Sequence, residues 1–130
     1  MNAFMQLGIT DTLAKLLYKN GIKTPTEIQR AAIPAIFKGR DIVGRSETGT
    51  GKTLAYLLPV MQRIRTDTEN TQVLIMTPTR ELAKQVFQVA GTFAKDMNID
   101  VTDVIGGRTI ENQIQKLKRD PHIVICLLYT

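Results

Sequence analysis

The chain has 130 residues, of which 43% are hydrophobic and 22% are charged, and its formal net charge is +5. This balance excludes an intrinsically disordered chain, and the length predicts one domain or part of one. Cys126 is the single cysteine, which excludes an internal disulfide and favours a reducing, cytoplasmic environment. The longest apolar run, residues 54–61, is far shorter than the roughly 20 residues that span a bilayer. The basic charge suits a nucleic-acid partner, but it fits a generally basic surface equally well.

The first predicted helix follows Thr10, a suitable N-cap, and ends before Gly21. Its apolar positions recur at helical spacing, at Leu13, Leu16 and Leu17. Because both boundary residues and the periodicity agree, we expect a short amphipathic helix over residues 11–20.

A second helix is expected to begin with Thr24 as its N-cap and Pro25 at the first helical position, with Glu27 completing a capping box. Its buried face is predicted at Ile28, Ala31 and Ala32. Pro34 is expected to break or kink this helix before Gly39, because a proline ring removes a backbone donor and clashes with the preceding turn.

The rest of the chain alternates predicted strands and helices. Strands are expected at residues 41–44, 73–76, 99–105 and 123–125, and helices at residues 52–64, 82–97 and 110–119. The continuous apolar run at 73–76 predicts a strand buried on both faces of a parallel sheet. This alternation predicts an α/β fold, with a parallel sheet flanked by helices. His122 has no second metal ligand at suitable spacing, so we interpret it as structural.

The segment at residues 46–53 predicts a site for the phosphates of a nucleotide. Glycines let the backbone turn its N–H groups into a shared hollow, and the following helix adds its positive dipole end. In this interpretation Lys52 reaches the β- and γ-phosphates and Thr53 ligates Mg²⁺. The nucleotide-binding residues are then Ser46, Glu47, Thr48, Gly49, Thr50, Gly51, Lys52 and Thr53. Ser46 replaces the first glycine of the usual G-x-x-x-x-G-K-[ST] pattern, and an ordinary glycine-rich turn with an exposed lysine is the alternative.

The surroundings of this loop resemble the DEAD-box RNA helicases, from about residue 4 to residue 125. Residues 21–29, which include Lys23, are similar to the Q motif of that family, although Ile22 departs from its usual aromatic. The resemblance assigns Gln29 and the isolated aromatic Phe4 to adenine, and it includes Lys23 in the nucleotide site. An amide can pair with one adenine edge and an aromatic ring can stack on the base, so ATP is expected over GTP. A solvated glutamine is the alternative.

Two further segments resemble elements of the same family that contact RNA. Residues 78–83 are similar to motif Ia, which implies contact with the sugar-phosphate backbone by Pro78, Thr79 and Arg80. A helix start, a hydroxyl and a guanidinium are all suitable phosphate partners, although an ordinary capped helix is the alternative. The segment formed by Gly106, Gly107 and Arg108 resembles the GG element of the family. It follows a predicted strand, and ligands bind at the carboxyl ends of strands in such sheets.

The resemblance implies a P-loop NTPase of the RecA-like type, truncated, that uses ATP and Mg²⁺ to unwind RNA duplexes. The expected organisation is a Q-motif region at 1–39, the phosphate loop and motif Ia units at 40–125, and an aberrant tail at 126–130. The 130 residues contain no Asp-Glu-Ala-Asp segment, which in this family supplies the carboxylate that helps to hold Mg²⁺. A fragment that binds nucleotide or RNA without turnover is therefore the alternative function. An unrelated P-loop protein is a third possibility, disfavoured by the Q motif and motif Ia.

Overall fold

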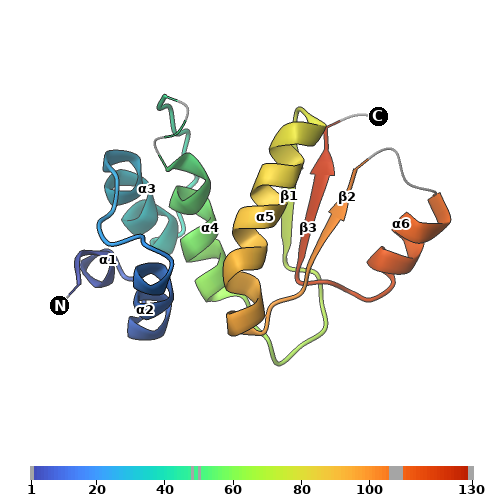
Figure 1. The fold of residues 1–130 in the computed structure, drawn as a ribbon, viewed down its shortest axis with the longest axis horizontal. Coiled ribbons are helices and arrows are strands. Elements are labelled where there is room, and N and C mark those ends of the chain that lie inside the picture. The colour runs from blue at the N-terminus through green and yellow to red at the C-terminus, as the bar shows by residue number, and fades with distance from the viewer. Residues whose placement is uncertain (1, 48, 50, 106–109, 129–130) are drawn as a thin grey trace. The chain divides into compact units, whose positions relative to one another are not determined.

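The computed structural model describes residues 2–47, 49, 51–105 and 110–128. The chain forms two compact units, residues 1–63 and 64–130. The first unit contains four helices among its described residues: α1 (Ala3–Gln6), α2 (Asp11–Lys19), α3 (Glu27–Phe37) and α4 (Lys52–Arg63). The second, in its described part, contains β1 (Val73–Thr77), α5 (Arg80–Met97), β2 (Val101–Val104), α6 (Ile110–Leu117) and β3 (Ile123–Leu127) (Figure 1).

The helical unit is held by a core that all four helices share. Its fully buried large side chains are Phe4, Leu13, Leu17, Ile33, Leu57, Leu58 and Met61. Helix α2 confirms the sequence prediction, because the Thr10 hydroxyl accepts a hydrogen bond from the Leu13 N–H at 3.3 Å and caps the helix. Helices α3 and α4 pack against each other, and α4 confirms the helix predicted after the glycine loop.

The start of α3 differs from the prediction by two residues, since Thr26 is its N-cap rather than Thr24. The Thr26 hydroxyl accepts from the Gln29 N–H at 3.4 Å, and the Gln29 Oε1 accepts from the Thr26 N–H at 2.9 Å. Gln29 therefore takes the capping-box role predicted for Glu27. Of the break or kink predicted at Pro34, a break is excluded, because α3 continues through Pro34 to Phe37 before it ends ahead of Gly39. A proline so near the end of a helix removes only one hydrogen bond from the last turns.

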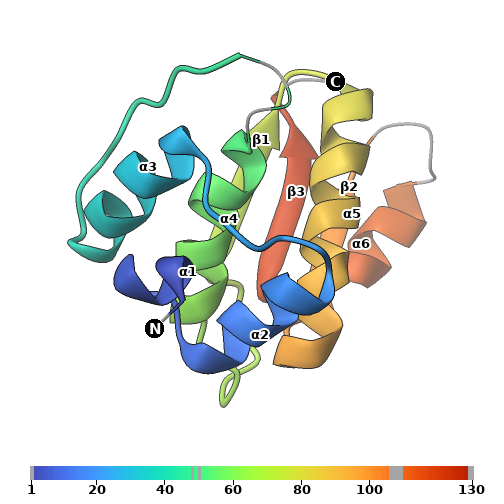
Figure 2. The same cartoon turned by 60° about the vertical axis from the view of Figure 1, so that its left-hand side comes forward.

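The segment that leads from α3 to the glycine loop contains no strand, so the strand predicted at residues 41–44 is wrong. Figure 2 shows residues after α3 as a long extended trace that returns to the start of α4. Val43 is 95% exposed. A strand persists when its backbone pairs with a neighbour, and the described sheet pairs only β1, β3 and β2.

The second unit is built on a parallel sheet with the order β1-β3-β2. Ile123 of β3 is in register with Val73 on one side and Val101 on the other. Helix α5 packs against all three strands (Figure 1). Its buried face consists of Ala83, Val86, Ala90, Phe93 and Ala94, whereas Leu82 in its first turn is exposed.

Burial within the sheet follows strand order. In β3 the consecutive residues Ile123, Val124 and Ile125 are all buried, so both faces of this central strand are covered. In β1 the side chains alternate, and Leu74 and Met76 are 61% and 51% exposed. The predicted burial of both faces is therefore wrong for β1, an edge strand of the described sheet, because the face that carries Leu74 and Met76 is exposed. β3 continues past the predicted end at Ile125, through Leu127.

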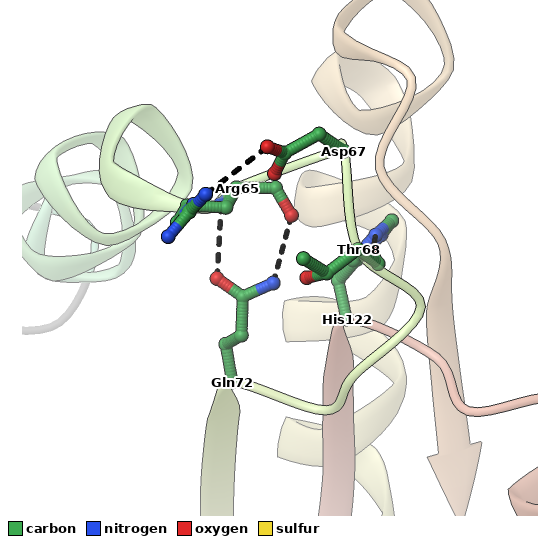
Figure 3. Close-up of polar contacts among 5 residues, drawn as sticks. All are labelled: Arg65, Asp67, Thr68, Gln72 and His122. Atoms are coloured by element: carbon green, nitrogen blue, oxygen red, sulfur yellow. Dashed lines mark hydrogen bonds and ion pairs between the residues drawn. The ribbon is translucent and has the colours of Figure 1, made fainter.

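Hydrogen bonds stabilise the loop between α4 and β1 (Figure 3). The Gln72 amide accepts from the Arg65 N–H at 2.9 Å and donates to the Arg65 carbonyl at 2.8 Å. His122 Nδ1 accepts from the Asp100 N–H at 2.9 Å, and Nε2 lies 3.0 Å from the Thr68 carbonyl, to which it donates in this tautomer. The structural role predicted for His122 is confirmed, since its ring connects three backbone segments.

Replacement of the central strand residue Ile125 by Ala is expected to lower the free energy of unfolding by about 2–5 kcal/mol, because a fully buried side chain leaves a cavity. Leu74→Ala is the matched control in the edge strand, and its exposed position predicts a change within about 0.5 kcal/mol. Urea denaturation of both variants measures the difference. Equal losses would contradict the assignment of β3 as the core of this unit.

Candidate nucleotide site

The glycine loop leads directly into α4, which begins at Lys52. Gly49 and Gly51 have φ angles of +83° and +88°, in the region that favours glycine. The Lys52 ammonium donates to the Ser46 carbonyl at 2.7 Å, so the side chain reaches back across the loop. Because α4 starts here, the positive end of its dipole also lies at the loop. Thr48 and Thr50, which the sequence assigns to the same site, lie outside the described residues.

Gln29 connects the start of α3 to this loop. Its Nε2 donates to the Gly51 carbonyl at 3.1 Å, while its Oε1 accepts from the Thr26 N–H. The side chain is 2% exposed, so the solvated alternative is wrong. Each amide end retains further hydrogen-bonding capacity, a second hydrogen on Nε2 and a second lone pair on Oε1. The structure thus brings together two segments that the sequence assigns separately to one nucleotide.

A pocket of about 600 Å³ lies between the first turn of α3 and the approach to the glycine loop. This volume is within the range of small-molecule sites. Its lining combines Thr26, Glu27, Ile28 and Ala31 with Arg45, Ser46 and Glu47. The prediction included only Ser46 and Glu47 among these residues. Thr26 could have been found from its Thr-x-x-Gln spacing to Gln29, but the contribution of Arg45 depends on the path of residues 40–47.

The three residues assigned to the nucleotide by the Q-motif resemblance, Gln29, Phe4 and Lys23, do not line this pocket. Phe4 is 0% exposed in α1, so its ring has no free face on which a base could stack in this conformation. Lys23 is exposed, and its ammonium lies 5.4 Å from the centroid of the Tyr18 ring. Phe4 is thus part of the core of the helical unit, and Lys23 makes a cation–π contact with Tyr18.

Thr53, the predicted magnesium ligand, is half-buried in the first turn of α4. Burial raises the pKa of the Tyr56 phenol, and a hydrogen bond with the Thr53 side chain partly offsets this shift. Among the described residues, no group of three or more His, Cys, Asp or Glu side chains could hold a metal ion.

In the second unit, the motif Ia-like segment lies at the carboxyl end of β1. Thr79 is the N-cap of α5, and its hydroxyl accepts from the Leu82 N–H at 3.1 Å. Pro78 and Arg80 are exposed beside it. The capped helix start, which was the alternative interpretation, is therefore present. The guanidinium of Arg80 is exposed and accessible to an anion. Gly106, Gly107 and Arg108 lie outside the described residues.

Comparison with known proteins decides the family. Residues 26–128 match the family described as DEAD/DEAH box helicase. The chain belongs to this family. It is 39% identical over 122 residues to the ATP-dependent RNA helicase CshA of Limosilactobacillus reuteri, covering 94% of this chain and 24% of that protein. It is 43% identical over 124 residues to the RNA helicase CrhR of Synechocystis sp., covering 95% of this chain and 25% of that protein.

Solved structures agree with the fold of this helicase family. The RNA helicase Prp28 from Chaetomium thermophilum, bound to ADP, matches with a TM-score of 0.86 and 35% identity, over 98% of this chain and 32% of that one. An ATP-dependent RNA helicase from Sulfolobus tokodaii, described as hypothetical, matches with a TM-score of 0.77 and 33% identity, over 87% of this chain and 32% of that one. The predicted α/β fold of the RecA-like type is confirmed. The chain spans about a quarter of the curated relatives CshA and CrhR.

None of the helices formed by the described residues has both the length and the apolar character needed to cross a membrane.

The glycines of the loop give a matched pair of substitutions. A Cβ at Gly51 would lie 2.5 Å from Gln29 Nε2, whereas a Cβ at Gly49 would meet nothing within 4 Å. Both alanines adopt an unfavourable positive φ, which costs about 1–2 kcal/mol. Gly51→Ala must also displace Gln29, and we expect a further loss of about 1–3 kcal/mol in the free energy of unfolding. Chemical denaturation tests this order, and equal losses would show that Gln29 yields without cost.

Proposed function

We propose that this chain is the ATP-binding portion of an ATP-dependent RNA helicase. The hydrogen bond from Gln29 to the Gly51 carbonyl carries the proposal, because it joins the Q-motif-like segment to the glycine loop. Family membership and the titles of CshA and CrhR support ATP as the nucleotide and RNA as the partner. A cytoplasmic location is part of the same proposal.

Phosphate binding in this proposal begins with Lys52. The ammonium now held by the Ser46 carbonyl would exchange that neutral acceptor for a phosphate oxygen, which forms a stronger, charge-assisted hydrogen bond. The start of α4 would stabilise the same anion through its dipole. Thr53 fits Mg²⁺ as a supplier of one hydroxyl oxygen, with the phosphates and water as the other ligands, and Mg²⁺ would neutralise phosphate charge there.

The adenine end is assigned to the pocket beside α3. Ile28 and Ala31 offer an apolar surface there. Gln29 follows Ile28 in the same turn of α3, and in this proposal the second hydrogen and second lone pair of its amide would pair with a base edge. Phe4 contributes through the core of the helical unit rather than by stacking, since its ring is buried.

RNA is assigned to the carboxyl edge of the sheet in the second unit. There the exposed Arg80 and the start of α5 are suited to a phosphate of the RNA backbone, with Pro78 and Thr79 shaping the turn. Gly106, Gly107 and Arg108 come after β2 in the sequence, and the resemblance to the GG element includes them in the proposed RNA surface.

A second candidate is a binding module that does not turn ATP over. It is favoured by the lack of an Asp-Glu-Ala-Asp segment within these 130 residues, since phosphoryl transfer needs a carboxylate near Mg²⁺ and a group that orients the attacking water. An ATPase assay with and without single-stranded RNA separates the two candidates. RNA-stimulated turnover by the chain itself would exclude the binding module.

Lys52→Ala is expected to abolish measurable ATP binding, because it removes the cation that would contact the phosphates. Lys19→Ala is the charge-matched control, since Lys19 is an exposed residue of α2 and lies in no predicted site. Titration calorimetry with ATP and Mg²⁺ measures both affinities. Unchanged affinity in the Lys52 variant would remove the phosphate-loop assignment.

Arg80→Ala is expected to weaken binding of single-stranded RNA by about three- to tenfold and to reduce the salt slope by about 0.7, the value for one phosphate contact. Arg119→Ala is the control, because Arg119 precedes the amino end of β3 and therefore lies at the opposite edge of the sheet. Fluorescence anisotropy over a range of salt concentrations measures both quantities. Equal effects of the two substitutions would indicate nonspecific attraction by net charge.

A further inference from the structure

Helices α3 and α4 are joined at both ends. At their amino ends the contact is between Gln29 and the Gly51 carbonyl. At their carboxyl ends Arg63 donates to the Phe37 carbonyl, and its guanidinium lies 5.7 Å from the centroid of the Phe37 ring. Since start meets start and end meets end, the two helices run in the same direction. The position of α4 along α3 is thus set partly at the end remote from the phosphate loop.

Gln62 adds a second contact at that remote end. Its Nε2 donates to the Gly8 carbonyl at 2.9 Å, and its Oε1 accepts from the Thr10 N–H at 2.9 Å. A planar amide that pairs with both a carbonyl and an N–H of one chain segment fixes its own rotation as well as its distance. The corner between α1 and α2 is therefore bound to α4 by a two-point contact.

The same corner is also packed against α3. Gly8 has a φ of +109°, and a Cβ there would lie 2.8 Å from the Phe37 ring. The α1–α2 corner is thus held against Phe37 of α3 on one side and by Gln62 of α4 on the other. Three segments meet here, and a change in one must displace the others because packed interiors deform little.

We propose that Gln62 is a positioning residue for the nucleotide site. It fixes the axial position and rotation of α4, and thereby the placement of Gly51 and Lys52 relative to Gln29. This inference rests on the proposed function. Gln62 and Lys52 are ten residues apart on one helix, a separation of about 15 Å, so Gln62 acts through α4 and does not itself reach the nucleotide.

Helix α4 couples its two ends because it moves as a rigid element. A helix of twelve residues transmits a shift or rotation at one end to the other, and phosphate contacts depend on sub-ångström placement. Without the two hydrogen bonds, α4 keeps its apolar packing and the Arg63 contact but loses the contact that fixes its rotation against the α1–α2 corner. The Gly51 carbonyl then moves relative to the Gln29 amide, which loosens the phosphate loop and the adenine pocket together.

The test uses the full chain and the substitution Gln62→Met, which keeps the length of the side chain and removes both hydrogen bonds. We expect the dissociation constant for ATP to rise about fivefold and the preference for ATP over GTP to narrow, within the range of remote coupling. Gln72→Met is the matched control, because Gln72 makes the same two-point amide contact in the other unit. Calorimetric titration with ATP and with GTP measures both effects.

Gln62→Glu separates positioning from a general loss of stability. The carboxylate can still accept from the Thr10 N–H but cannot donate to the Gly8 carbonyl, so an intermediate ATP affinity is expected. Hydrogen exchange at the amides of residues 51–55 should accelerate in the Met variant and not in the Gln72 control. Equal ATP affinity in wild type and Gln62→Met would overturn the inference while leaving the proposed function intact. Failure of the wild type to bind ATP would overturn both.

Discussion

The arrangement of the helical unit depends on the amide of Gln29. One end of this buried side chain closes the capping box of α3, and the other end holds the carbonyl of Gly51. A buried amide must satisfy both its donor and its acceptor, and here two different backbone segments do so. The consequence is that the start of α3 and the phosphate loop cannot move independently. Gly51 must be a glycine for the same reason, since the Gln29 amide occupies the space of its Cβ.

Caps and apolar spacing in the sequence predicted the helices that depend on contacts between residues close in the chain. Helix α2, with its Thr10 cap, and helix α4 after the glycine loop agree with the sequence prediction. The cap of α3 was missed because Thr24 and Thr26 lie two residues apart and both suit an N-cap. Both also offer a capping-box spacing, Thr24 to Glu27 and Thr26 to Gln29, and the second is the one whose N3 residue also contacts Gly51, twenty-two residues away. Such a contact leaves no trace in a local pattern, so the boundary moved by two residues.

The order of strands in the sheet could not be predicted from local sequence patterns either. Apolar composition identified β1 and β3, but not which of them would be central. Burial on both faces depends on position in the sheet: β3 has it at Ile123, Val124 and Ile125, whereas β1 exposes Leu74 and Met76 on one face. The segment at residues 41–44 has the composition of a strand but no partner in the described sheet. Phe4 is a related case at the candidate site, because the resemblance assigns its ring to a base while the core buries it.

The start of α5 adds a condition on how this chain could hold RNA. The Thr79 hydroxyl already accepts from the Leu82 N–H, so one of the four amide donors at that helix end is occupied. Glu81 in the first turn stabilises the helix dipole but repels a phosphate at the same place. The net attraction for an anion at this end therefore depends on the guanidinium of Arg80, which must outweigh the carboxylate beside it. The RNA surface and the nucleotide loop thus differ in kind, since α4 begins with the cation Lys52 and has no acidic residue in its first turn.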